Sequence, residues 1–103
     1  MAEDKNHLVD PTASYELHPQ VAVRPEPFGA LVYHYGNRKL VFLKSTRMVA
    51  VVKSLDAARS INAALEMNGV AENQRTKYLV ALSSLFASDM IVGVPERVSS
   101  HAH

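Results

Sequence analysis

The sequence predicts a small α+β domain of winged-helix type, in which a three-stranded antiparallel sheet packs on three helices. The chain has 103 residues, a length that suits one domain. Short runs rich in β-branched and aromatic residues fill its first half, and apolar residues at helical spacing follow after residue 45. Neither a sheet of three strands nor three short helices can bury its apolar face alone, so each is expected to cover the other.

The predicted strands lie between residues 21 and 43. A short extended segment at 21–24 precedes Pro25-Glu26-Pro27, which we interpret as a bend because proline fixes its own φ and restricts the residue before it. Runs at 29–35 and 39–43 flank Gly36-Asn37 and predict a hairpin, in which the glycine is expected to supply the positive φ of a tight turn.

The predicted helices occupy the second half of the chain. Ser45 is expected to cap the first helix, although the unbroken apolar run at 48–52 leaves a buried strand as the alternative. Asp56 is the candidate cap of the second helix, which Asn68-Gly69 should end. The third helix is predicted over about 72–88, because its apolar residues fall within an arc of roughly 120°.

The domain is expected to cover residues 17–95, with loose segments at both ends. Residues 1–16 show no sustained periodicity and are predicted to form a flexible acidic arm, and residues 96–103 a loose tail. The formal net charge of +1 conceals an uneven distribution, since residues 38–55 contain five basic and no acidic side chains. Such a segment can attract an acidic partner or simply keep the surface soluble, and the sequence leaves both readings open.

Composition excludes several classes of protein. The sequence contains no cysteine, which rules out a disulfide scaffold, a thiolate-bound metal centre and a cysteine nucleophile. No apolar run approaches the roughly 18 residues needed to span a bilayer, and the polar start argues against a signal peptide. We therefore expect a cytoplasmic protein with no membrane partner.

The pattern of chemically active residues does not predict an enzyme. The five histidines are scattered apart from the pair in the tail, so we expect no metal site and no cofactor. His34, within a predicted strand, is interpreted as a surface or satisfied interior histidine. Neither a phosphate-binding glycine motif nor a catalytic triad pattern is present.

The segment Lys39–Leu43 is the strongest candidate for a binding site. Both faces of this predicted strand are apolar, which is typical of a central strand or of one that pairs with a partner. In a sheet of only three strands it can lie at an edge, where free backbone groups would accept a peptide strand. The alternative is that each face packs on a helix and no partner is needed.

Two segments of the sequence resemble a known family. Arg24-Pro25-Glu26-Pro27-Phe28-Gly29 and Arg38-Lys39-Leu40-Val41-Phe42-Leu43 are similar to the peptide chaperones of mycofactocin biosynthesis. More broadly, the chain resembles the precursor-recognition domains of ribosomally made peptide natural products, which include the pyrroloquinoline-quinone peptide chaperone. The resemblance covers about residues 17–92, but the helices match only in pattern.

The resemblance implies a non-catalytic domain that binds a precursor peptide and presents it to a separate radical S-adenosylmethionine maturase. In that family the leader segment of the precursor pairs with the third strand and lies beside the third helix. Carried onto this sequence, it implies a set of peptide-binding residues on that strand and helix: Lys39, Leu40, Val41, Phe42, Leu43, Gln74, Lys77, Tyr78, Ala81, Leu82 and Leu85.

Two other functions are compatible with the same pattern. Winged helices often bind DNA, so a DNA-binding transcriptional regulator is the main alternative. The sequence pI of about 8.1 lies below the basic range above roughly 9 that is usual for such domains, and we expect no nucleic-acid partner. A domain that associates with its own copy through the edge strand is the other alternative.

Overall fold

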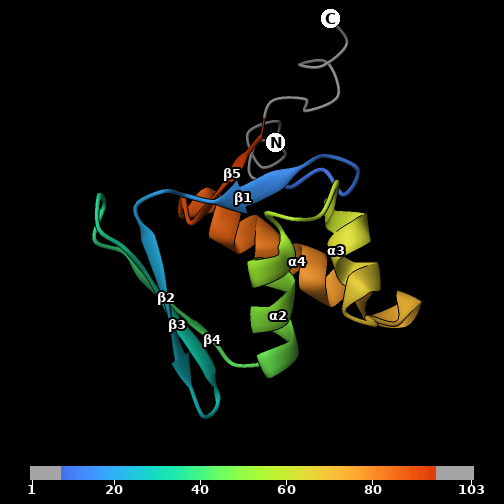
Figure 1. Cartoon of the computed structure of the whole chain (residues 1–103), viewed down its shortest axis with the longest axis horizontal. Coiled ribbons are helices and arrows are strands. Elements are labelled where there is room, and N and C mark those ends of the chain that lie inside the picture. Colours follow the sequence, from blue (N-terminus) through green and yellow to red (C-terminus); the bar gives the residue numbers. More distant parts are fainter. Residues whose placement is uncertain (1–7, 95–103) are drawn as a thin grey trace, which may run out of the picture.

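A computed structural model describes residues 8–94 of the chain (Figure 1). The described strands form two antiparallel sheets, one of β1 (Tyr15–Leu17) with β5 (Ile91–Gly93), and one in the order β2 (Val21–Glu26), β3 (Gly29–His34), β4 (Leu40–Leu43). The helices are α2 (Thr46–Ser54), α3 (Ile61–Met67) and α4 (Arg75–Ala87), with a 3₁₀ turn, η1 (Glu72–Gln74), before α4. The α+β architecture that the sequence predicts is therefore confirmed, with its three-stranded sheet and three helices.

Helix α2 lies against the three-stranded sheet, α3 lies on the far side of α2, and the core lies between the sheet and the helices (Figure 1). In β3, Ala30 and Val32 are fully buried, and Val32 belongs to the core cluster that includes Val51 of α2. Leu65 of α3 and Leu82 of α4 belong to the same cluster. No helix within residues 8–94 is both long and apolar enough to cross a membrane.

Two serines begin the first two helices. Ser45 accepts a hydrogen bond from the N–H of Met48 at 3.1 Å, so the run that could have been a buried strand is helix α2. The second helix is capped by Ser60, which accepts from the N–H of Ala63 at 3.1 Å. The prediction of Asp56 as this cap is wrong, because the residues after α2 form turns before the chain becomes extended at Ser60.

The hairpin between β3 and β4 forms where the sequence predicts it, but its turn works differently. The left-handed residue is Arg38, with φ of 65°, and not Gly36. Gly36 is closely packed, since a Cβ there would lie 2.8 Å from Cε1 of the buried His34 ring. The prediction of a bend over Pro25-Glu26-Pro27 is wrong for its first two residues, which pair with β3 as the end of β2.

The segment before β1 packs against the domain. Val9 is buried and its N–H donates to Oγ of Ser83 on α4 at 3.1 Å. The hydroxyl of Tyr15 accepts the N–H of Asp10 at 2.8 Å, and its ring meets Phe86 edge to face with centroids 5.6 Å apart. These contacts hold the segment against α4.

This packing corrects the predicted extent of the N-terminal arm. Residues 8–16, expected to be flexible, are held by the contacts above and by the pairing of β1 with β5. Hydrogen bonds from the hydroxyl and N–H of Thr12 also keep the pKa of Asp10 below its ordinary value. Residues 1–7 and the predicted tail at 96–103 lie outside the described residues.

Gly29 provides a test of how closely β3 and β4 approach each other. Its φ is 155°, and a Cβ added there would lie 1.9 Å from the backbone oxygen of Leu43. We predict that Gly29→Ala lowers the free energy of unfolding by about 2 kcal/mol or more, because the backbone of β4 must shift. Gly93→Ala is the matched control, since a Cβ there meets no atom within 4 Å. Thermal unfolding followed by circular dichroism measures both, and equal stability of the two variants would contradict this packing.

Tyr15→Phe tests whether the N-terminal segment contributes to stability. The substitution keeps the ring against Phe86 but removes the hydroxyl that accepts the Asp10 N–H. We predict a loss of about 0.5–1.5 kcal/mol in the free energy of unfolding, the usual worth of one hydrogen bond. Urea denaturation measures it, and a stability identical to that of the unmodified protein would show that residues 8–14 are not held as described.

Candidate functional site

The free edge of β4 exposes backbone groups that no strand satisfies. Within the hairpin, the N–H of His34 donates to the carbonyl of Lys39 at 3.0 Å. Hydrogen-bonded and non-hydrogen-bonded pairs alternate along antiparallel strands, and Val32 pairs with Val41 in this register. The N–H and C=O of Val41 therefore point to β3, whereas those of the residues on either side of it, Leu40 and Phe42, point away from the sheet.

The opposite edge of the same sheet is less able to accept a strand. The N–H of Tyr35 donates to the carbonyl of Gln20 at 2.8 Å, and the same alternation places Val23 and Pro25 with their backbone groups outward. Pro25 has no N–H to donate, and proline at an edge is a common protection against further strands. Of the two edges of this sheet, β4 is thus the one suited to pairing.

A groove runs beside this edge, between β4, the start of α2 and the N-terminal half of α4. Its volume is about 370 Å³. The lining consists of apolar side chains, buried or half-buried except for the exposed Phe42, with polar and cationic ones around them: Phe42, Leu43, Lys44, Ser45, Met48, Gln74, Lys77, Tyr78 and Ala81. A mostly apolar groove next to unpaired backbone groups is the arrangement that binds an extended peptide.

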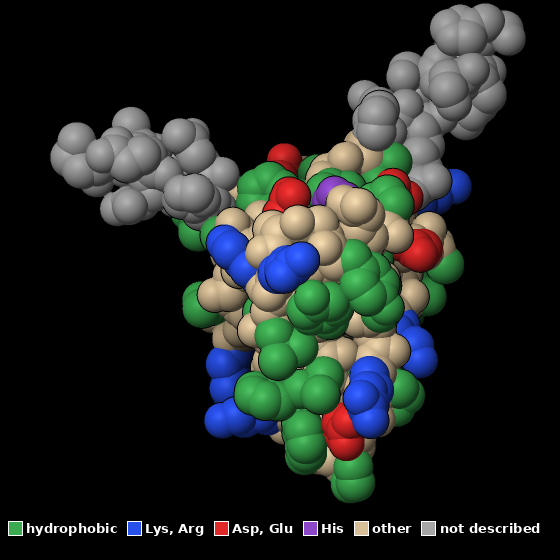
Figure 2. Space-filling view, turned by 90° about the vertical axis from the view of Figure 1, so that its left-hand side faces the viewer, with side chains coloured by type: hydrophobic (Ala, Val, Ile, Leu, Met, Phe, Trp, Pro, Cys, Tyr) green, Lys and Arg blue, Asp and Glu red, His purple; other side chains and the backbone are tan. Residues whose placement is uncertain are grey.

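The two faces of β4 have different surroundings, which explains why both are apolar. Leu43 faces the helices and is buried. Leu40 and Phe42 face the other way and remain 54% and 55% exposed, with the ring of Phe28 edge to face with Phe42 at 6.1 Å. Figure 2 shows apolar side chains gathered on this side of the molecule. Helix packing therefore accounts for one face of the strand, and the other face is open.

The structure brings most of the predicted binding residues to one place. The groove is lined by Phe42, Leu43, Gln74, Lys77, Tyr78 and Ala81 from the predicted set. Lys39, Leu40 and Val41 lie on β4 or directly before it. Leu82 and Leu85 are 0% and 2% exposed, so they belong to the core and a peptide in the groove would not touch them.

Sequence reasoning missed three residues of the groove. Lys44 and Ser45 follow β4 directly, and Met48 is the first inward residue of α2 after its cap. The cap signal at Ser45 could have indicated that the chain turns there, which brings the start of α2 beside the strand. Nothing in the pattern of α2 alone distinguishes Met48 from an ordinary core residue.

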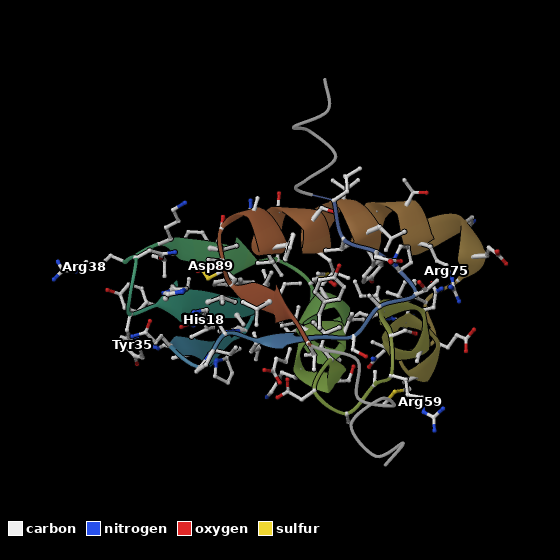
Figure 3. All side chains as sticks on the ribbon, turned by 90° about the horizontal axis from the view of Figure 1, so that it is seen from above. His18, Tyr35, Arg38, Arg59, Arg75 and Asp89 are labelled. Carbon is white, nitrogen blue, oxygen red and sulfur yellow. The ribbon has the colours of Figure 1, made fainter. Side chains whose placement is uncertain are left out.

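A second cluster, at the far end of the sheet, joins His18, His34 and Asp89. One side-chain atom of each lies within 4.8 Å of the others, a spacing that could hold a metal ion. Figure 3 shows His18 beside Asp89, where the chain enters β2 and leaves α4. The Nε2 atoms of His18 and His34 lie 3.9 and 3.7 Å from the same oxygen of Asp89.

The hydrogen bonds of the two histidines indicate that this cluster has a structural role. Nδ1 of His34 accepts the N–H groups of Gly36 and Asn37 at 3.0 and 3.1 Å, and Nδ1 of His18 accepts the N–H of Gln20 at 3.0 Å. A nitrogen that accepts a hydrogen bond carries no proton, so each neutral ring carries its proton on Nε2, toward Asp89. That leaves no Nε2 lone pair for a metal, and the cluster is better described as two N–H groups facing a carboxylate.

Comparison with known proteins gives a consistent result. The model of the peptide chaperone MftB family matches residues 14–92. The chain is 54% identical over 88 residues to the peptide chaperone MftB of Mycolicibacterium smegmatis, an alignment that covers 84% of this chain and 86% of that one. It is 52% identical over 83 residues to the peptide chaperone MftB of Mycobacterium tuberculosis, which covers 81% of this chain and 76% of the relative.

No solved structure matches the chain. The family model nevertheless spans nearly all of the described residues, including β4 and the whole of α4. On this evidence the chain belongs to the peptide chaperone MftB family.

Proposed function

We propose that this protein binds a ribosomally made precursor peptide by adding a strand of the leader segment to β4, and delivers it to the radical S-adenosylmethionine maturase of mycofactocin biosynthesis. The relatives are named peptide chaperones, which supports a peptide as the ligand. The observation that carries the binding mode is the free edge of β4 beside an apolar groove. Main-chain hydrogen bonds would supply affinity, and the groove would fix the register.

A strand added at this edge would use both faces of β4. Its backbone would pair with the outward N–H and C=O groups of Leu40 and Phe42. Successive side chains of a strand point to opposite faces, so every second one would enter the groove toward Tyr78 and Ala81. The others would extend the open face of the sheet next to the exposed Phe42.

The partner enzyme would perform the chemical reaction. The relatives are named peptide chaperones, a non-catalytic role, and the 103 residues contain no cysteine to ligate an iron–sulfur cluster. We therefore propose that this chain holds and presents the peptide, while the maturase carries the cluster and performs the reaction. No cofactor is part of the proposal for this chain.

The alternative of a DNA-binding regulator receives less support. In a winged helix α4 would be the recognition helix, and its first turns would need free cationic side chains. Arg75 is instead engaged by Oδ1 of Asn62 at 3.0 Å and by a carboxylate oxygen of Glu66 at 3.5 Å, which leaves Lys77 as the one basic residue of the described α4 without an ion pair. Tyr78 and Ala81 of the same helix line the groove and not an open surface. We accordingly propose no nucleic-acid partner.

Paired substitutions at Phe42 test strand addition. Phe42→Ala removes the side chain but keeps the outward N–H, whereas Phe42→Pro removes both. We predict that the proline variant binds the mycofactocin precursor peptide roughly two- to tenfold more weakly than the alanine variant, as expected for one lost hydrogen bond of about 0.5–1.5 kcal/mol. Isothermal titration calorimetry measures the affinities, and circular dichroism checks that both variants fold.

The outcomes separate the two parts of the proposal. Equal affinity of the folded alanine and proline variants would rule out pairing at the β4 edge but leave peptide binding intact. Absence of any binding by the unmodified protein would overturn the chaperone function itself. Delivery is tested by copurification of the maturase with the protein and precursor together, and failure of that complex to form would contradict that step.

A further inference from the structure

Two lysines stand at the groove without a counter-charge. Lys44 comes from the link between β4 and α2, and Lys77 from α4, so the groove has a cation from each of its two walls. Both side chains belong to exposed residues. The residues that line the groove include no Asp or Glu, and neither lysine makes an ion pair within residues 8–94.

Three arginines of the described residues have partners, in contrast to these two lysines. Nη1 of Arg47 donates to the carbonyl of Gly69 at 3.0 Å, and Arg24 lies 3.4 Å from a carboxylate oxygen of Glu26. Arg75, two residues before Lys77 in α4, contacts Asn62 and Glu66. Among the residues that line the groove, the basic ones are Lys44 and Lys77, and neither is neutralised by an ion pair within residues 8–94.

We infer that the groove selects a precursor segment that is both acidic and amphipathic, with an apolar side chain for the groove and Asp or Glu close to it in the sequence. This inference rests on the proposed function and names the chemistry of its ligand. The apolar lining requires an apolar side chain, since a charge placed there would lose its water without a partner. The two lysines favour carboxylates on the residues around it, because opposite charges steer the encounter and fix the register.

The expected size of the effect follows from exposure. A solvent-exposed ion pair contributes about 0.2–1 kcal/mol, and reversal of the charge adds a repulsion of similar size. Each lysine should then change the affinity by roughly two- to thirtyfold on reversal, and the contribution should weaken as salt is added. A lysine that only keeps the surface soluble would show neither effect.

The test compares charge reversals at the groove with a matched reversal outside it. Lys44→Glu and Lys77→Glu are titrated with the mycofactocin precursor peptide by calorimetry at low and high salt. Lys53→Glu is the control, because Lys53 is exposed at the end of α2, does not line the groove and gives the same change in net charge. We expect about twofold weaker binding or more for each groove variant, and less than twofold for the control.

A second peptide tests whether the two lysines act on the carboxylates of the leader. Replacement of every Asp and Glu of the leader by Asn and Gln should weaken binding to the unmodified protein, and Lys44→Glu should then cause little further loss. Equal binding of all three lysine variants, or a leader without acidic residues that binds fully, would overturn the inference while leaving strand addition standing. Failure of the unmodified protein to bind the precursor would instead overturn the proposed function, and this inference with it.

Discussion

A strand at the edge of a sheet satisfies only half of its backbone groups, and the ability of β4 to pair with a peptide depends on which of its groups are left unpaired. The pairing of β3 with β4 directs the groups of Val41 inward and those of Leu40 and Phe42 outward. Gly29 permits this pairing, because any side chain there would collide with the backbone of Leu43. Pro25 lies on the opposite edge, β2, and lacks an N–H to donate. The edge at β4 can therefore accept a further strand, whereas the edge at β2 is protected from one.

Helix α4 serves the core and the groove at the same time. Leu82 and Leu85 are buried and anchor the helix in the core. The neighbouring strip of the same helix, with Tyr78 and Ala81, is turned toward β4 and forms the wall of the groove. The position of that wall therefore depends on core packing, which couples the stability of the domain to the shape of its binding site.

Local signals in the sequence predicted the hairpin, the cap at Ser45 and the extent of α4, because short-range hydrogen bonds and helical periodicity determine them. The pairing of β1 with β5 could not be predicted, since each strand has three residues and the two lie at opposite ends of the domain. Periodicity likewise placed Leu82 and Leu85 on the same arc as Tyr78, but it carries no information on depth. The edge position of β4 and the existence of the groove can be recognised only in the assembled fold.

Amide hydrogen exchange on β4, followed by NMR with and without saturating precursor peptide, tests the central claim most directly. The account predicts that the amides of Leu40 and Phe42 exchange more slowly in the complex, because their N–H groups gain partners from the added strand. The amides of Val41 and Leu43 should change little, since they already donate within the sheet. Unchanged exchange at Leu40 and Phe42 in the saturated complex would contradict strand addition at β4.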